Sequence, residues 1–283
     1  MNTIDTSMRA LEIQGTTVPK LGFGTWQIEG PEAEEAVRDA LEIGYRHIDT
    51  ARAYDNEEEV GRGIKASGVD REDIWVTTKV WMEDFAPDDL RESAETSLRK
   101  LGLDSVDLLL LHWPPANGSE LKPALDTLKQ LREEGKISQL GVSNFPGYML
   151  REALEAEPEI FANQVEYHAK LSQKELLEIA AEHDLLIEAY APLSGSAGDL
   201  VDEPLLKEIA DQHDAKPGQV ALAWLAQQDR VVLLPRSTDA GRRRENLAAL
   251  EVELTDEERQ RIDELSDQRQ RNFDPPFAPD WRD

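Results

Sequence analysis

The sequence contains no cysteine and is poor in basic residues. Among its 283 residues, 31 are Lys or Arg and 58 are Asp or Glu, so the formal net charge is −27. Without cysteine, the chain can form neither a disulfide framework nor a thiolate metal site. A field this negative repels nucleic-acid phosphates and anionic lipids, so we expect no nucleic-acid partner and no membrane surface as partner.

Long hydrophobic runs are also absent. Apolar runs such as residues 108–111 are far shorter than a membrane span. Residues 1–10 contain no apolar segment of the signal-peptide kind, so we expect no leader and a cytoplasmic protein. Hydrophobic residues nevertheless make up 40% of the chain, enough for a large core. No linker or break in composition divides the chain, which predicts one domain over residues 1–283.

Short apolar segments alternate with amphipathic helical segments along the chain. In residues 31–44, for example, the apolar residues recur with the period of one helix face. The predicted strands are residues 20–24, 45–49, 74–79, 106–111, 137–142, 160–163, 185–190 and 231–235. Their nearly continuous hydrophobicity is typical of strands covered by helices. Eight such strands joined by helices predict an α/β fold, the (β/α)8 TIM barrel.

Both ends of the chain add to this barrel. Residues 11–13 and 17–19 flank a Gln14-Gly15 turn and predict an N-terminal β-hairpin. Residues 257–265 predict an extra C-terminal helix, and an irregular tail follows it over residues 272–283. Two capping boxes are predicted at helix starts, Ser172 with Glu175 and Thr255 with Glu258.

The ends of the predicted strands carry residues of an unusual kind. In barrels of this class the active site lies at the C-terminal ends of the strands. In strand order these ends hold Gly24-Thr25-Trp26, Asp49, Lys79, His112-Trp113, Ser143-Asn144, Gln164, Tyr190 and Arg236-Ser237. A single polar residue at a strand end is ordinarily just solvated, but the same signal at eight ends indicates a functional site.

Three kinds of chemistry are open to Asp49, Lys79 and His112. Asp and His are metal ligands, but a lysine aimed at the same centre disfavours a cation, so we expect no metal. A Schiff-base lysine must be neutral, whereas a neighbouring aspartate keeps it charged. The third option is a proton donor. Tyr54 follows Asp49 by five residues, and we expect the Lys79 ammonium to lower the pKa of its phenol. A neutral His112 would donate a hydrogen bond to a substrate oxygen.

The same strand ends resemble the aldo-keto reductase family. The matching stretches, in family order, are LGFGTW (21–26), HIDTARAYDNE (47–57), TTKVW (77–81), LLLLHWP (108–114), GVSNF (141–145), NQVEYH (163–168), YAPLSG (190–195) and LPRSTDAGRRREN (233–246). The resemblance implies that Tyr54 is the acid, that Lys79 and Asp49 tune it, and that His112 orients the carbonyl. The implied reaction is reduction of aldehydes or ketones to alcohols by hydride transfer from NADPH. The short tail fits the smaller microbial members of the family, and the chain resembles their reductases of diketo-sugar acids and small dicarbonyls.

The resemblance also implies a cofactor site across the barrel mouth. Ser143, Asn144 and Gln164 would hold the nicotinamide carboxamide, and Tyr190 would stack beneath the ring. The 2′-phosphate and adenine end would be held by Arg236, Ser237, Arg242 and Asn246, with Glu245 alongside. The further cofactor positions are Gly24, Thr25, Trp26 and Leu193. The basic cluster formed by Arg236 and residues 242–244 fits a phosphate, although the latter run also fits a helix surface that offsets nearby acids. The family often has lysine where this chain has Arg236, so NADH remains possible.

Substrate residues are predicted from aromatic residues at the same strand ends. Trp26, Trp81 and Trp113 would line a pocket for apolar carbonyl compounds, with Phe277 and Trp281 of the tail as further candidates. Residues 61–66 fit the G-x-G-x-x-A dinucleotide fingerprint, but they follow an acidic helix-like stretch instead of a strand. We therefore expect a helix C-terminus there and no phosphate loop.

Other readings of the chain are a silent barrel that senses nicotinamide and a lyase that uses Lys79 as a Schiff base. We expect a monomer, since no heptad or apolar stripe calls for a dimer. The acidic residues assigned to outer helices are Glu32, Glu34, Glu35, residues 57–59, Asp88, Asp89, Glu133, Glu134, Glu257 and Glu258. Such a surface around a conventional core indicates adaptation to a salty cytosol, where screening relieves the self-repulsion; the alternative is an ordinary acidic protein.

Overall fold

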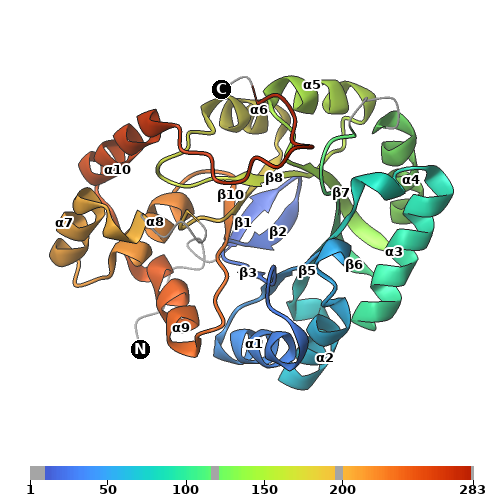
Figure 1. Ribbon diagram of the computed structural model, residues 1–283, viewed down its shortest axis with the longest axis horizontal. Coiled ribbons are helices and arrows are strands. Elements are labelled where there is room, and N and C mark those ends of the chain that lie inside the picture. The colour runs from blue at the N-terminus through green and yellow to red at the C-terminus, as the bar shows by residue number, and fades with distance from the viewer. Residues whose placement is uncertain (1–9, 116–120, 195–199, 282–283) are drawn as a thin grey trace.

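The computed structural model describes residues 10–115, 121–194 and 200–281, and these form the predicted barrel. Eight parallel strands lie in one sheet in the order β10-β9-β8-β7-β6-β5-β4-β3, and helices surround them (Figure 1). The barrel strands are β3 (Phe23–Gly24), β4 (His47–Asp49), β5 (Trp75–Val80), β6 (Val106–Leu111), β7 (Ile137–Ser143), β8 (Ala162–Glu166), β9 (Leu186–Tyr190) and β10 (Val231–Leu234). Each predicted strand is therefore present; β6 has the predicted bounds, and the other strands differ from the prediction at one or both ends.

The outer layer is made of helices that follow the strands. They are α1 (Gly30–Ile43), α2 (Glu57–Ser67), α3 (Pro87–Leu101), α4 (Leu121–Glu133), α5 (Gly147–Ala156), α6 (Lys174–His183), α7 (Pro204–Gln212), α8 (Pro217–Ala226), α9 (Ala240–Ala248) and α10 (Asp256–Asp263). Their apolar faces and the outward faces of the strands form the main core. Among the helices that the structure describes, none has both the length and the apolar character that crossing a membrane would require.

The sheet curls until its first and last strands meet. Gly22 N donates to Leu233 O at 2.8 Å and Gly24 N donates to Pro235 O at 3.1 Å, while Leu21 pairs with Leu233 in a parallel bridge. A Cβ atom on Gly22 would lie 2.4 Å from Leu234 Cδ2 and 3.0 Å from His47 Cγ, so a larger residue here would require these side chains to move. The contact explains why β3 is shorter than predicted, because this segment bridges to β10 instead of running as a regular strand.

The predicted hairpin closes the N-terminal end of the barrel. Strands β1 (Ala10–Ile13) and β2 (Thr16–Pro19) pair antiparallel and are visible through the barrel in Figure 1. Ile13 and Val18 are buried against inward-facing barrel residues such as Leu108 and Val232, in a second apolar cluster. Because apolar residues fill this end, the polar chemistry is confined to the opposite one.

The dinucleotide-like fingerprint forms the C-terminal half of α2, which ends at Ser67, so it lies at a helix C-terminus, as expected, and not in a loop. A Cβ on Gly61 would lie 2.2 Å from Leu101 O, and one on Gly63 would lie 2.7 Å from Glu34 O. These two glycines therefore let α2 pack directly against α3 and α1. Packing between helices explains the pattern, and no phosphate loop is present there.

Two local predictions need comment. The capping box at Thr255 and Glu258 is confirmed, with both reciprocal hydrogen bonds in place. The one at Ser172 and Glu175 is wrong, because α6 begins one residue later, with Gln173 at the N-cap position and no side-chain cap. Ser172 Oγ instead accepts a hydrogen bond from Lys174 N at 3.3 Å.

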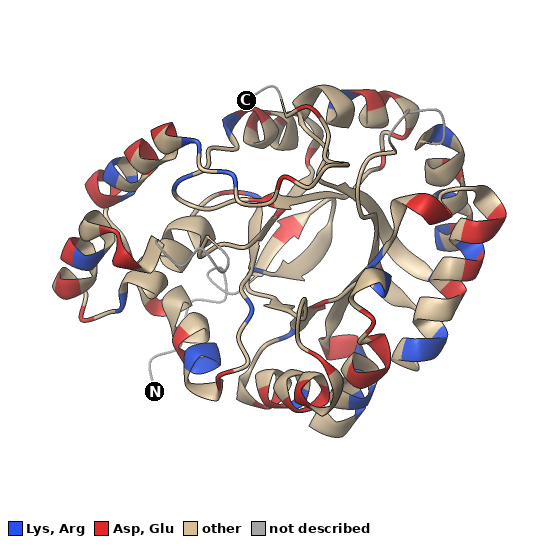
Figure 2. Cartoon of the chain, in the orientation of Figure 1, with Lys and Arg blue, Asp and Glu red and all other residues tan. Residues whose placement is uncertain are grey.

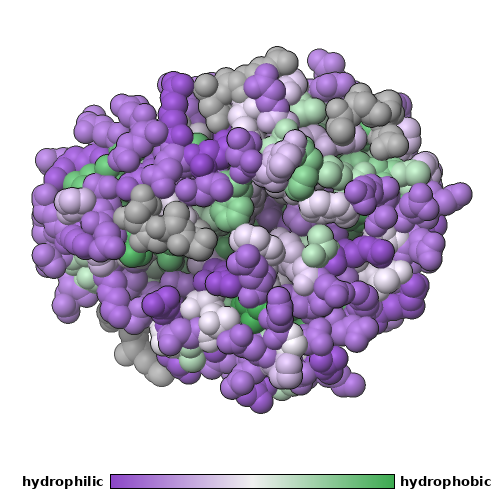
Figure 3. Space-filling view, viewed as in Figure 1, coloured by the Kyte–Doolittle hydropathy of each residue, from purple (hydrophilic) through white to green (hydrophobic). Residues whose placement is uncertain are grey.

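The acidic residues lie mainly on the outer helices, as Figure 2 shows. Two of those assigned there are buried instead of exposed. Glu57 is 1% exposed and accepts a hydrogen bond from Thr78 Oγ1, and Glu258 is held in its capping box. Figure 3 shows a mostly hydrophilic face with a central depression, and paler, more apolar residues border it.

Candidate active site

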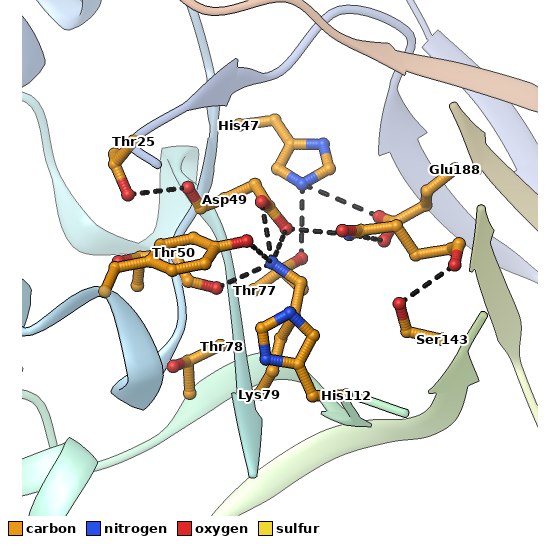
Figure 4. A network of polar contacts seen from close by, with 12 residues as sticks. Thr25, His47, Asp49, Thr50, Thr77, Thr78, Lys79, His112, Ser143 and Glu188 are labelled. Carbon is orange, nitrogen blue, oxygen red and sulfur yellow. Dashed lines mark hydrogen bonds and ion pairs between the residues drawn. The ribbon is translucent and has the colours of Figure 1, made fainter. Parts of the chain in front are cut away.

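A buried ion pair lies at the C-terminal ends of β4 and β5. Lys79 Nζ donates to the two carboxylate oxygens of Asp49 at 2.8 and 2.9 Å, and to Thr50 O at 2.8 Å (Figure 4). Lys79 is fully buried. Burial alone would lower the pKa of Lys79, but Asp49 and Tyr54 outweigh it and hold this pKa above its usual value. Lys79 is therefore a fixed ammonium ion.

Tyr54 joins this pair from a short 3₁₀ helix, Arg52–Tyr54, that follows β4. Its hydroxyl oxygen accepts a hydrogen bond from Lys79 Nζ at 3.2 Å. We expected the Lys79 ammonium to lower the pKa of the phenol. Lys79 does act in this direction, but burial raises the pKa of Tyr54 by more, so the expected net lowering is wrong. The phenol therefore keeps its proton at neutral pH, as a proton donor must.

His112 lies directly after β6 and faces the same centre. Its ring packs edge-to-face on Tyr54, with centroids 5.7 Å apart, and on Trp81, with centroids 5.2 Å apart. Burial, together with the nearby Lys79 ammonium, lowers the pKa of His112 well below its usual value. The imidazole is therefore neutral, which is the form that the predicted hydrogen bond to a carbonyl oxygen needs.

The predicted nicotinamide residues gather at the ends of β7, β8 and β9. Asn144 Nδ2 donates to His112 O at 2.9 Å, and the Tyr190 hydroxyl donates to Asn144 Oδ1 at 2.8 Å. Ser143 Oγ donates to Gln164 O at 2.9 Å. We had predicted that Gln164 follows the end of its strand. This is wrong, because β8 continues to Glu166 and Gln164 lies within it. These hydrogen bonds hold the group in one arrangement beside Asp49, Tyr54, Lys79 and His112, which are called the tetrad from here on.

The predicted basic cluster is split by the structure. Arg236 is exposed and donates to Trp26 O and Gln27 O, both at 3.0 Å. Arg242 is exposed at the start of α9, where its backbone nitrogen donates to Asp239. Arg243 is 3% exposed and binds Asp39 and two backbone carbonyls, so it is a structural residue and not part of a surface cluster.

The other predicted cofactor residues surround these two arginines or the mouth. Ser237 and Asn246 are buried, and Glu245 forms an ion pair with Lys216. Thr25 is buried and donates to Asp49 O at 3.0 Å, while Leu193 is half-buried after β9. Gly24 lies in close contact with β10, since a Cβ there would be 3.3 Å from Leu234 O. The last residue of the matching stretch 190–195 lies outside the described residues.

The three predicted pocket tryptophans meet the C-terminal tail. Phe277 packs edge-to-face against Trp81 and Trp113, with ring centroids 5.5 and 5.2 Å apart. Phe273 packs in the same way against Trp26 and Tyr190, at 5.4 and 5.5 Å. Together they form an aromatic wall, defined as Trp26, Trp81, Trp113, Phe273 and Phe277. This wall borders the tetrad through the contact between Trp81 and His112.

Sequence reasoning missed three residues at this end of the barrel: Phe273, Glu166 and Glu188. Phe273 belongs to an irregular tail, for which the sequence offers no periodic signal. The backbone nitrogens of Asn272 and Phe273 donate to the buried carboxylate of Glu166, which ties the tail to β8. Glu188 is fully buried in β9, and its position two residues before the inward-facing Tyr190 was the available signal.

The donor set of the site fits a nicotinamide dinucleotide better than a metal ion. In residues 10–115, 121–194 and 200–281, no cluster of three or more metal-ligating side chains occurs. Amide groups and an aromatic ring lie beside the tetrad, and two exposed guanidinium groups lie near β10 and α9. An amide-rich end and a cationic end match a carboxamide and a phosphate.

A comparison with known proteins agrees with this geometry. The model of the Aldo/keto reductase family matches residues 20–267. Two curated relatives are a 9,11-endoperoxide prostaglandin H2 reductase of Trypanosoma cruzi, 41% identical over 91% of both chains, and a glyoxal reductase of Bacillus subtilis, 42% identical over 89% of this chain and 90% of that protein. The chain therefore belongs to the aldo/keto reductase family.

Solved structures show the same fold. A putative 2,5-diketo-D-gluconic acid reductase B superposes with a TM-score of 0.93 at 38% identity, covering 98% of this chain and 99% of that one. An aldose reductase from Schistosoma japonicum superposes with a TM-score of 0.89 at 32% identity, covering 95% of each. As a family member, this chain is an NAD(P)H-dependent oxidoreductase of small carbonyl compounds.

Proposed function

We propose that this enzyme reduces aldehydes and ketones to alcohols with NADPH, and that Tyr54 is the general acid. The hydrogen-bonded group of Tyr54, Lys79 and Asp49 carries the proposal, because it joins a protonated phenol to a fixed ammonium ion. When bound, the nicotinamide cofactor would supply the hydride for the carbonyl carbon. The Tyr54 proton goes to the carbonyl oxygen, and Lys79 stabilises the phenolate that remains.

The neighbouring residues have supporting roles in this proposal. Neutral His112 donates a hydrogen bond that orients the carbonyl group. Ser143, Asn144 and Gln164 hold the carboxamide of the nicotinamide, and Tyr190 stacks against the ring. Near β10, Arg236 and Arg242 bind the 2′-phosphate, because guanidinium groups suit phosphate oxygens. This favours NADPH over NADH, and it implies a cytoplasmic enzyme, since NADPH is an intracellular reductant.

The substrates we propose are apolar or modestly polar aldehydes, ketones and dicarbonyls. The aromatic wall supports this class, because it presents large apolar rings beside the tetrad. The names of the relatives, a glyoxal reductase and a diketo-gluconic acid reductase, point to the same chemistry. The first experiment is a matrix of NADPH and NADH oxidation against such compounds, repeated at low and molar salt.

Two variants test the assignment of roles. Tyr54→Phe removes the proton donor and leaves the ring, so turnover falls by about 100-fold or more while NADPH affinity stays nearly unchanged. Normal turnover in this variant refutes Tyr54 as the acid. Arg236→Ala weakens NADPH binding far more than NADH binding, and equal losses refute contact with the 2′-phosphate.

The two competing functions predict different results. A lyase needs a neutral lysine, whereas Asp49 and Tyr54 hold the pKa of Lys79 above its usual value. Trapping a substrate on Lys79 with borohydride would establish the lyase instead. A nicotinamide sensor would bind NADPH and reduce no member of the carbonyl panel.

A further inference from the structure

One buried carboxyl group beside the tetrad has no part in the mechanism above. Glu188 lies in β9 and is fully buried, with its carboxyl group inside the barrel (Figure 4). Its Oε2 accepts a hydrogen bond from Gln164 Nε2 at 2.9 Å. Its Oε1 has no hydrogen-bond partner within the described part of the chain, and His47 Nε2 is 3.7 Å away.

The Gln164 amide joins this carboxyl group to the tetrad. Its Nε2 atom also donates to Asp49 Oδ2, at 2.8 Å. An amide nitrogen carries two hydrogens, so both are used, one for each acid. Asp49 is the carboxylate partner of the Lys79 ammonium and can only accept, which requires the amide nitrogen to face it. Because both amide hydrogens are used in this way, the Gln164 amide oxygen is the atom of the amide group that remains available to a ligand.

We propose that Glu188 is a positioning residue of the proposed reductase site, and that it fixes the orientation of the Gln164 amide. Without this second acceptor, one amide hydrogen would be buried and unsatisfied, and a single hydrogen bond to Asp49 would be left to hold the amide. The inference rests on the proposed function in one respect only: that the ligand of the Gln164 amide oxygen is the carboxamide of the nicotinamide. The orientation itself concerns the protein alone.

The charges around Glu188 indicate whether its carboxyl group is ionised or neutral when it accepts the hydrogen bond from Gln164. His47 and Asp49 face it from β4 and Lys79 from β5, while its neighbour on β10, Val232, is apolar. Burial, with the Asp49 charge added, raises the pKa of Glu188 to about 8. The pKa of His47 falls to about 3 through burial, so no cation of β4 balances an ionised Glu188. A neutral acid still offers a carbonyl oxygen to Gln164.

Two variants separate the hydrogen bond from the volume of the side chain. Glu188→Gln is neutral at every pH and keeps a carbonyl acceptor, so it should preserve the orientation. Glu188→Met keeps the length and removes both oxygens. Val232→Ala, at the position paired with Glu188 on β10, is the control for general disturbance of the barrel interior.

The first measurement needs no cofactor: hydrogen exchange of the Gln164 side-chain amide, followed by NMR. Buried, hydrogen-bonded amide hydrogens exchange slowly. We expect slow exchange in the wild type, Glu188→Gln and Val232→Ala, and exchange about tenfold faster or more for one hydrogen in Glu188→Met. If Glu188→Met exchanges like the wild type, or Glu188→Gln like Glu188→Met, the positioning role is refuted.

The second measurement is NADPH affinity from quenching of tryptophan fluorescence. Loss of the fixed amide should weaken binding about tenfold in Glu188→Met, and Glu188→Gln should restore it to within about twofold of wild type. Equal affinity of Glu188→Met and wild type contradicts the proposal. If the wild type itself binds no NADPH, the proposed function fails, while the exchange experiment still decides the role of Glu188.

Discussion

The buried acid Glu188 makes the stability of this protein depend on pH in a way that one substitution removes. The folded-state pKa of Glu188 is about 8, against an ordinary value of 4.5. Between these two values the folded protein keeps the proton while the unfolded chain releases it. The contribution of Glu188 to the unfolding free energy is therefore fully present below pH 4.5 and is lost as the pH rises toward 8.

The size of the effect follows from the same two values. Well inside this window, each pH unit removes about 1.4 kcal/mol of unfolding free energy, so the loss between about pH 5 and pH 7 is about 2–3 kcal/mol. Glutamine at this position does not titrate and should not contribute this loss. Because other titrating groups are common to both proteins, the difference between the two stability curves isolates Glu188.

Urea unfolding at several pH values between about 5 and 8 measures this difference. The advantage of Glu188→Gln over the wild type should grow by about 2–3 kcal/mol from about pH 5 to pH 7. The control is Glu133→Gln, which removes an exposed carboxylate of α4 and should give a curve parallel to that of the wild type. Parallel curves for Glu188→Gln as well would refute a buried neutral acid.

Three further predictions concern the ion pair, the helix packing and the surface. Lys79→Met leaves the buried Asp49 carboxylate without its cation, so it should abolish turnover and cost about 3–5 kcal/mol in urea unfolding. Gly61→Ala places a Cβ 2.2 Å from Leu101 O, and should cost about 1–3 kcal/mol by thermal unfolding; unchanged stability would contradict the close contact. If the acidic surface reflects a salty cytosol, the unfolding free energy should rise up to molar KCl, whereas greatest stability at low ionic strength counts against this.

The candidate site shows how far local pattern reaches. Asp49, Lys79 and His112 were predictable because the barrel rule places strand C-termini at one end, and the structure brings them together with Tyr54. The direction of the Tyr54 pKa was not predictable, because it is a balance between burial and one ammonium ion. Burial is a property of the packed barrel and of the tail that covers it.

The sequence by itself determined the barrel, the hairpin and the polar strand ends, since hydrophobic period and turn residues act over a few neighbours. Only the tertiary structure decided which neighbours meet across the barrel. It assigned Arg243 to the core and Arg242 to the surface, and it seated Phe273 against Tyr190. It also joined Glu188 to Asp49 through Gln164. These contacts link residues far apart in the chain, so they depend on strand register and barrel closure, which no local pattern contains.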